Sequence, residues 1–162
     1  MNDKFHYVTA TAIVMKDGKF LILKRSTHEK AFPGKWTFPG GKLERADYEN
    51  RPPSTSQQQW YNILEDLVKR EVMEESGLKI KNIRYVTSLV FIRPDNIPVV
   101  TVSFVADYDG GEIVLEEDMT DYAWVTLEEA KDYDMIEGLQ EELIMLDKML
   151  EGKHVERWSR NP

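Results

Sequence analysis

Apolar and β-branched residues gather in several short runs along the chain. The runs cover residues 5–15, 19–26, 83–92, 98–108 and 122–125. Asp17-Gly18 stands between the first two runs, and an Asp-Gly pair in that place is typical of a tight β-hairpin. The turn sequence Arg93-Pro94-Asp95-Asn96 separates the next two runs in the same way. The pattern therefore predicts two hairpins and one short final strand.

Other segments have the spacing or the end signals of helices. The first leads up to Gly77, a residue type that commonly ends a helix in the left-handed conformation. The sequence Thr126-Leu127-Glu128-Glu129 has the form of a capping box and predicts the start of a second helix. A last helix is expected from about Met135, because Ile136, Leu139, Leu143, Leu146 and Leu150 recur at helical intervals. This order of elements predicts an α/β fold, a mixed β-sheet flanked by helices in a single domain over residues 1–162.

The first predicted helix carries three glutamates on its last turns. Glu71 and Glu75 continue an apolar stripe that passes through Val68, and Glu74 is placed on the same side. A solvated acidic face normally lies opposite the buried face, so these carboxylates are expected at the edge of the core. Carboxylates there must be paired or bind metal, and Arg70 alone cannot neutralise three of them. Hard divalent cations such as Mg²⁺ prefer such oxygen ligands.

Composition narrows the range of partners and compartments. The net charge of −8 and the pI near 5.0 argue against non-specific binding of nucleic acid, which needs clustered Lys and Arg. The absence of cysteine excludes disulfides and zinc–thiolate sites and fits a reducing compartment. No apolar run approaches the roughly 18 residues of a membrane span, and the N-terminus lacks the pattern of a signal peptide. We therefore expect a cytoplasmic protein with no nucleic acid and no membrane as partner.

Two motifs together resemble the signature box of the Nudix hydrolase family. They are "GGKLE" (40–44) and "REVMEESGL" (70–78), with a glycine, an acidic residue six positions on, and the run Arg-Glu-apolar-x-Glu-Glu-x-Gly-apolar. The flanking stretches "KRSTHEKAFPGKWTFPGG" and "DYAWVTLEEA" are also similar to that family, so the resemblance covers most of the chain. It implies a Nudix-type α/β/α sandwich that hydrolyses diphosphate bonds, with Glu71, Glu74, Glu75 and Arg70 as catalytic residues. It also implies that the three glutamates and the Gly40 carbonyl bind Mg²⁺, with Mn²⁺ as an alternative, and that Arg70 orients the glutamates.

Cationic and aromatic residues before the box are candidates for substrate binding. Lys24, Arg25 and Lys35 are candidates for contact with substrate phosphates, although Lys35 is equally well explained as a solvated surface lysine. Phe38 is a candidate for contact with a nucleobase, although a core position is the commoner role for such a ring.

A second acidic group precedes Trp124, where the family often supplies another acidic ligand or base. Its members are Glu116, Glu117, Asp118 and Asp121, and the sequence does not distinguish which of them acts. We take Glu117 and Asp118 as the expected additional metal ligands.

The box departs from the family pattern in two ways. Asp47 stands where the family has glutamate, and fifteen extra residues separate it from Arg70. The extra segment "RADYENRPPSTSQQQ" (45–59) is polar and predicts a surface loop, with a lid or specificity loop as the alternative. One residue of 54–56 is expected to cap a helix that begins near Gln57.

Three functions remain open from the sequence. The first is Mg²⁺-dependent hydrolysis of a diphosphate bond in a nucleoside triphosphate or an oxidised nucleotide. The second is hydrolysis of a nucleoside diphosphate sugar such as ADP-ribose, for which Pro94, sixteen residues beyond the box, is a weak marker. The third is a non-catalytic module that senses a nucleotide, which the complete set of glutamates disfavours. The expected partner is a small-molecule nucleotide substrate, and a homodimer is left open.

Overall fold

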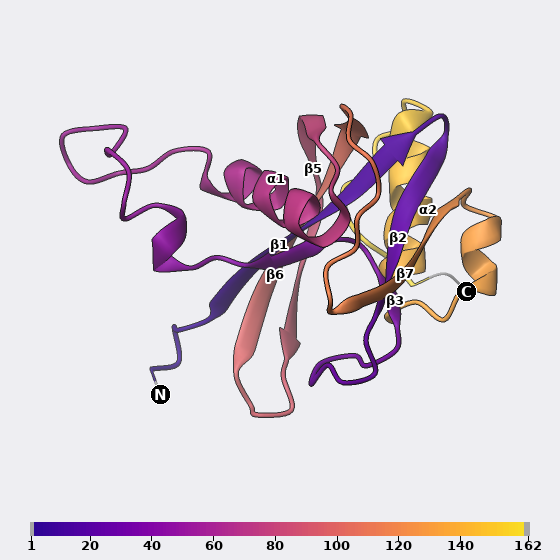
Figure 1. The fold of residues 1–162 in the computed structure, drawn as a ribbon, viewed down its shortest axis with the longest axis horizontal. Helices are drawn as coiled ribbons and strands as arrows, with labels where there is room; N and C mark the ends of the chain where they lie inside the picture. Colours follow the sequence, from indigo (N-terminus) through magenta and orange to yellow (C-terminus); the bar gives the residue numbers. More distant parts are fainter. Residues whose placement is uncertain (1, 161–162) are drawn as a thin grey trace.

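The computed structural model describes residues 2–160, and its strands form one seven-stranded sheet (Figure 1). The order along the sheet is β3-β2-β1-β6-β5, with β4 paired to β1 and β7 paired to β2. The strands are β1 (Tyr7–Lys16), β2 (Lys19–Arg25), β3 (Trp36–Thr37), β4 (Gly40–Lys42), β5 (Ile80–Ile92), β6 (Pro98–Tyr108) and β7 (Met119–Val125). The helices are η1 (Arg45–Asp47), α1 (Ile63–Ser76), η2 (Glu129–Asp132) and α2 (Leu139–Leu150).

Both predicted hairpins are present. Asp17 and Gly18 have φ values of 50° and 74° between β1 and β2, and two left-handed residues in succession match the twist of adjacent antiparallel strands. β5 and β6 form the second hairpin. β1 runs parallel to β6, whereas it is antiparallel to β2 and β4. The sheet is therefore mixed, as the order of elements predicted.

The sheet separates two hydrophobic cores. Ala12 and Val14 of β1 pack in one core with Val68 and Val72 of α1, whereas Ile13 packs in the other core. That second core contains Leu143 and Leu146 of α2. Because successive side chains of a strand point to opposite faces, α1 and α2 cover opposite faces of the sheet. The predicted α/β/α arrangement is confirmed.

The helix boundaries differ from the sequence prediction at α1. This helix begins at Ile63 and not near Gln57, because Gln58 and Asn62 both have left-handed φ values, of 54° and 59°. Ser54 does not cap the helix either, since its hydroxyl accepts a hydrogen bond from the Tyr61 N–H within the loop. The prediction of a helix starting in the insertion is therefore wrong.

The segment after β7 also differs from the prediction. Thr126 and Glu129 form the predicted reciprocal capping contacts, with N···O distances of 2.8 and 3.1 Å, but these open only the short 3₁₀ helix η2. Met135 does not begin a helix; it forms a parallel bridge with Trp36. α2 begins four residues later, after Gly138 with a φ of 96°.

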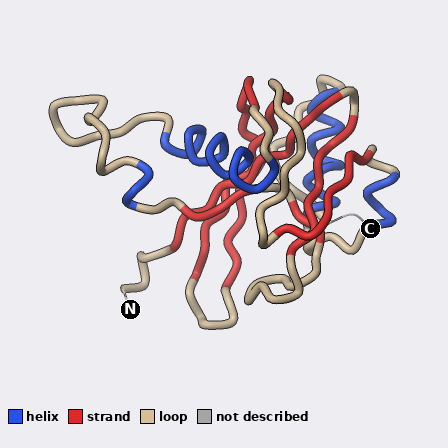
Figure 2. Tube along the Cα trace, viewed as in Figure 1, coloured by secondary structure: helices blue, strands red, loops and turns tan. Residues whose placement is uncertain are grey.

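The insertion folds back beside the N-terminal half of α1 and projects from the rest of the fold as a loop (Figures 1 and 2). Ion pairs of 2.9 Å join Arg51 to Asp66, and Asp47 to Arg70, on that helix. Within residues 2–160, no helix combines the length and the apolar character that a membrane span requires.

Candidate active site

Two glycines of β4 lie against the last turns of α1. A Cβ atom on Gly41 would lie 2.3 Å from the carboxyl carbon of Glu71, and a Cβ on Gly40 would lie 2.3 Å from the carbonyl oxygen of Ala10. At Gly40 the obstructing atom is backbone of β1, so the packing of β4 on β1 requires glycine there, whereas at Gly41 a side chain would displace the Glu71 carboxylate. The glycine pair thereby allows the carboxylate of Glu71 to rest on the backbone of β4.

The Glu75 carboxyl group lies inside this junction. The residue is 7% exposed, and its Oε2 accepts a hydrogen bond of 3.1 Å from the Gly40 N–H. Burial raises the pKa of Glu75 to about 8, and the negative charges of Glu71 and Glu116 act in the same direction. The Gly40 N–H and the cation of Arg25 counteract only part of this effect on the pKa.

Arg70 connects the other carboxylates of the site. Its Nη1 lies 2.9 Å from Glu71 and 3.0 Å from Glu74, and its Nε lies 2.9 Å from Asp47. Burial nevertheless raises the pKa of Glu71, because the cation of Arg70 offsets only part of the desolvation and of the repulsion from nearby acids. The expectation that Glu71 and Glu75 lie at the edge of the core agrees with the structure. It is wrong for Glu74, whose side chain is 49% exposed.

Glu116 is the downstream acid that reaches the cluster. Its N–H donates to the Glu75 carbonyl oxygen over 3.2 Å, and its charge raises the pKa of both Glu71 and Glu75. Glu117 and Asp118 lie exposed on the turn that follows, which a bond from Met119 N–H to Glu116 closes. The structure thus favours Glu116 over Glu117 and Asp118, because the backbone bond holds Glu116 at the end of α1 and its charge is among the main influences on the pKa of Glu71 and Glu75. The acidic run in the sequence gave no indication of the bond between the Glu116 N–H and the Glu75 carbonyl.

The cationic candidates occupy different places. Arg25 lies near Glu75, whose pKa it lowers, and also donates to the Ala31 carbonyl and pairs with Glu29, so it holds the loop after β2. Lys24 lies half-buried on β2, and Lys35 pairs with Asp134 at 2.6 Å.

The other two candidates are Asp121, one of the downstream acids, and Phe38, a possible contact for a nucleobase. Asp121 of β7 stands opposite Lys24 in the sheet register. Phe38 is 2% exposed and packs in the α2-side core, so its ring has no free face for a substrate. The expectation that Phe38 binds substrate is wrong, because the Phe38 side chain is buried in the core.

The donor set of this site suits a hard divalent cation. Among residues 2–160, no three His, Cys, Asp or Glu side chains already stand in metal-binding geometry, since Arg70 and the Gly40 N–H contact the oxygens of Glu71 and Glu75. Burial and mutual repulsion raise the pKa of both glutamates, and a bound cation would relieve that cost. Glu71, Glu75 and Glu116 are the residues that fit this role.

The chain was compared with protein families and with known proteins. The family model described as NUDIX domain matches residues 5–145. Over 62 residues the chain is 47% identical to the NAD-capped RNA hydrolase NudC of Citrobacter koseri, a match that covers 38% of this chain and 23% of that protein. The chain therefore spans less than a quarter of that relative's length.

Two solved structures share the fold. The MutT NUDIX hydrolase from Burkholderia pseudomallei has a TM-score of 0.69 and 21% identity, covering 88% of this chain and 99% of its own. The NUDIX domain of Shewanella oneidensis NrtR, in complex with ADP ribose, has a TM-score of 0.67 and 21% identity, covering 91% of this chain and 90% of its own.

The family match extends over the strands, both glycines of β4 and all three glutamates of α1. Its range also includes the fifteen extra residues at 45–59. From this match we conclude that the chain belongs to the Nudix family.

Proposed function

We propose that this chain is a divalent-metal-dependent hydrolase of a diphosphate bond in a nucleotide. The observation that carries the proposal is the convergence of Glu71 and Glu75, both largely removed from water, on the Gly40-Gly41 backbone, with the charge of Glu116 close enough to raise the pKa of both. A surface acidic patch would leave these groups solvated. Mg²⁺ is the proposed cofactor and Mn²⁺ the alternative.

In this proposal the chain's own residues supply positioning. A bound divalent cation neutralises diphosphate charge and acidifies a coordinated water molecule. Glu71, Glu75 and Glu116 would hold the cation, and the Gly40 N–H keeps the Glu75 carboxyl turned toward β4. Arg70 fixes Glu71 from the other side. Phosphoryl displacement depends mainly on such positioning and electrostatic stabilisation.

Nucleoside triphosphates or oxidised nucleotides are the first proposed substrates, and a nucleoside diphosphate joined to a further group is the second. The second candidate draws support from NudC, whose name states that it acts on NAD-capped RNA, and from the NrtR domain bound to ADP ribose. Because NudC is named for its action on capped RNA, the acidic net charge of this chain does not exclude an RNA cap as substrate. The presence of Glu71, Glu74 and Glu75 together still disfavours a non-catalytic sensor.

The remaining expectations about the molecule stay predictions. One sheet joins the described residues, which supports a single domain over 1–162. Exposed apolar side chains on the edge strand β5, including Leu89, Val90 and Ile92, are compatible with the homodimer. A cytoplasmic location is likewise proposed.

The test is hydrolysis of a panel of nucleotides with Mg²⁺, with Mn²⁺ and in chelator. Glu71→Gln, Glu75→Gln and Glu116→Gln should each lower turnover by about 10-fold or more, because each removes an anionic metal ligand. Glu117→Gln is the matched control beside Glu116 and should retain parental turnover. Full activity of the Glu71 and Glu75 variants would remove the cluster from the mechanism, and a loss in Glu117→Gln alone would restore the assignment made from the sequence.

A further inference from the structure

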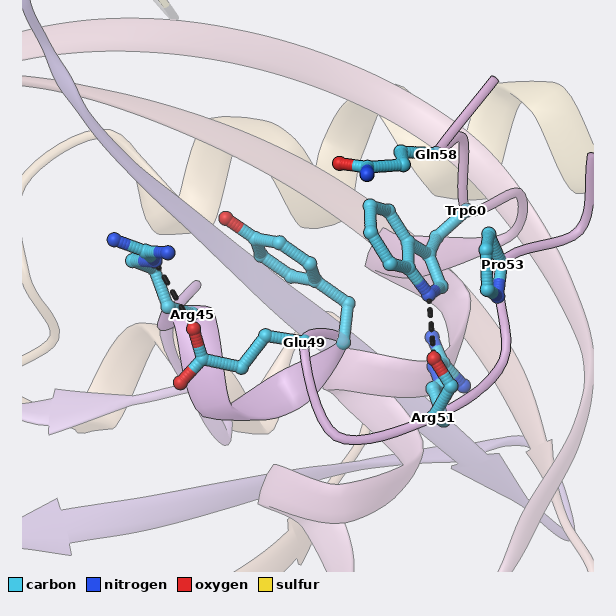
Figure 3. A pocket seen from close by; sticks show the side chains of 7 residues that line it. Arg45, Glu49, Arg51, Pro53, Gln58 and Trp60 are labelled. Carbon is cyan, nitrogen blue, oxygen red and sulfur yellow. Dashed lines mark hydrogen bonds and ion pairs between the residues drawn. The ribbon is translucent and has the colours of Figure 1, made fainter. Parts of the chain in front are cut away.

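The insertion forms an open cavity of about 510 Å³ beside the N-terminal half of α1 (Figure 3). Its lining combines the rings of Tyr48, Pro53 and Trp60 with the side chains of Arg45, Arg51 and Gln58. A volume of this size falls in the range of small-molecule sites, about 300–1,000 Å³. The cavity is separate from the glutamate cluster and is built by residues that the Nudix box does not use.

Internal contacts hold the walls of this cavity. Trp60 Nε1 donates to the Arg51 carbonyl at 3.1 Å, as drawn in Figure 3, and the Ser54 N–H donates to the Gln59 carbonyl at 2.7 Å. The rings of Tyr48 and Trp60 are 5.3 Å apart at 51°. The aromatic wall is therefore fixed before a ligand arrives, which lowers the entropy cost of binding.

Arg51 has unused hydrogen-bonding capacity at the cavity wall. Its Nη1 pairs with Asp66, whereas its Nε and Nη2 are buried and have no hydrogen-bond partner within the described part of the chain. Buried donors without partners are costly, and this edge of the guanidinium matches two oxygens of a phosphate once the side chain turns toward the cavity. Arg45 and Glu49, which also lines the cavity, form an ion pair of 3.1 Å and together add no net charge, so Arg51 is the cation available to a phosphate.

The cavity and the glutamate cluster are connected through α1. Asp66, which anchors Arg51, precedes Glu71 by five residues on α1, or about 7.5 Å along the helix axis. Asp47, next to Tyr48, contacts Arg70, which in turn contacts Glu71. A dinucleotide that occupies both sites must therefore extend along α1 from Arg51 toward Glu71.

We propose that this cavity binds a nucleotide unit, with its base against Trp60 and Tyr48 and its phosphate at Arg51. The inference rests on the proposed function in one respect: the bound unit is the second half of a dinucleotide whose diphosphate lies at the glutamates. Binding of the unit alone needs no turnover and no metal, so it can be tested separately.

The first experiment measures calorimetric binding of AMP in chelator. Trp60→Ala should weaken binding between about 5-fold and 150-fold, the range for one base–aromatic stack, while Trp60→Phe keeps most of it. Arg51→Lys, which keeps the charge for Asp66 and loses the fork, should also weaken binding. Trp158→Ala and Arg84→Gln, exposed residues outside the insertion, are matched controls that should bind AMP as the parent does.

The second experiment compares the kinetics of a dinucleotide, NAD⁺, with those of ATP. Trp60→Ala should raise KM for NAD⁺ by a factor in the same range, about 5 to 150, and change KM for ATP less than about 2-fold. The proposal would be overturned by any of three results in the AMP experiment. AMP binds equally to the parent and to Trp60→Ala, AMP binding is lost only in Glu71→Gln, or AMP does not bind to the parent. Equal loss of both substrates would also contradict it.

The two proposals fail in different ways. A parent protein that hydrolyses no nucleotide but binds AMP through Trp60 contradicts the proposed function and leaves the insertion site standing. If the parent protein hydrolyses nucleotides, but neither its kinetics nor its AMP binding depends on Trp60 or Arg51, the insertion site is contradicted and the proposed function stands. Melting curves of each variant show whether the loop change has unfolded the domain.

Discussion

At the scale of single residues, Arg70 controls how the carboxylates of α1 are arranged. One guanidinium group contacts Asp47, Glu71 and Glu74 at 2.9–3.0 Å. Its rigid fork can hold several carboxylates in fixed directions, which a lysine cannot do. The carboxyl groups on α1 therefore depend on Asp47, which lies 23 positions before Arg70, in the first part of the insertion.

Asp47→Ala is expected to lower kcat by about 10-fold through Arg70 and to leave the fold intact. Loss of one partner of a charged pair typically costs about 1.5–3 kcal/mol of local interaction. Asp47→Glu restores the carboxylate and should recover most of the activity. Steady-state kinetics of both variants over a Mg²⁺ titration checks this, and an inactive Asp47→Glu protein would show that the shorter side chain is required.

Glu75→Gln is expected to stabilise the metal-free protein while abolishing activity. Above about pH 8, where the Glu75 carboxyl is ionised in the folded protein, the change removes a charge that burial disfavours, and glutamine can still accept the Gly40 N–H bond. It also removes an anion near the C-terminal end of a helix and its repulsion from Glu71, which together contribute roughly 1 kcal/mol. The melting temperature in chelator should rise by about 2–4 °C.

The measurement is a pair of melting curves, one in chelator and one with Mg²⁺. Added Mg²⁺ should reverse the ranking, because a protein with intact ligands gains stability from binding. A lower melting temperature for Glu75→Gln in chelator would mean that Arg25 and the Gly40 N–H stabilise the ionised group more than burial penalises it.

The limits of prediction at this scale follow from particular residues. The spacing of Glu71 and Glu75 along a helix was sufficient to place them on the buried side, because helix geometry fixes which residues share a face. The same spacing did not place Glu74 correctly, because its ion pair with Arg70 keeps its side chain at the protein surface. The choice of Glu116 over Glu117 depends on one backbone bond between distant segments, which no local pattern encodes.

At the scale of elements, strands were easier to predict than helix ends. Asp17-Gly18 and the alternation of β1 dictate a hairpin locally. In contrast, the start of α1 depends on left-handed residues at 58 and 62 and on contacts of the insertion with Trp60, none of which has a periodic signal. The capping box at Thr126 formed as predicted, yet the helix after it is only one turn, because residues 134–136 pair with Trp36 of β3 instead.

Replacement of residues 48–58 by a short Gly-Ser link is expected to leave the fold nearly intact. The segment contributes no residue to either core, and its main contact outside the insertion is the exposed ion pair of Arg51 with Asp66. Such a pair contributes about 0–1 kcal/mol. The melting temperature should fall by only a few degrees while KM for NAD⁺ rises, and a variant that no longer folds would show that α1 needs the insertion to form.

At the scale of the whole molecule, the two faces of the sheet carry different chemistry. The α1 face ends in the glutamate cluster, whereas the α2 face contains a single buried acid, Glu142, which is 2% exposed. Thr11 donates a hydrogen bond of 3.2 Å to the Ser103 hydroxyl, which leaves that hydroxyl free to donate to Glu142. The other carboxyl oxygen of Glu142 has no partner among residues 2–160. The core thus retains an uncompensated group when Glu142 ionises.

This group should make the stability of the whole domain depend on pH. Burial raises the pKa of Glu142 from 4.5 to about 7, and the hydrogen bond with Ser103 opposes this only in part. Between these pH values the folded protein keeps a proton that the unfolded chain releases. The free energy of unfolding therefore falls as pH rises through this window, and the loss is complete above about pH 7.

Glu142→Gln should remove this contribution, because the amide has the same shape and no charge. Each unit of pKa shift corresponds to about 1.4 kcal/mol, so the variant should exceed the parent by about 3 kcal/mol at pH 8 and by little at pH 4.5. Urea unfolding in chelator at the two pH values measures the difference, and Glu141→Gln on the same helix is the matched control. Subtracting parent from variant cancels the titration of Glu75, which both proteins share. An equal difference at both pH values would mean that Glu142 is already ionised in the folded core at low pH, and that the sheet hydroxyls or a bound cation stabilise its charge.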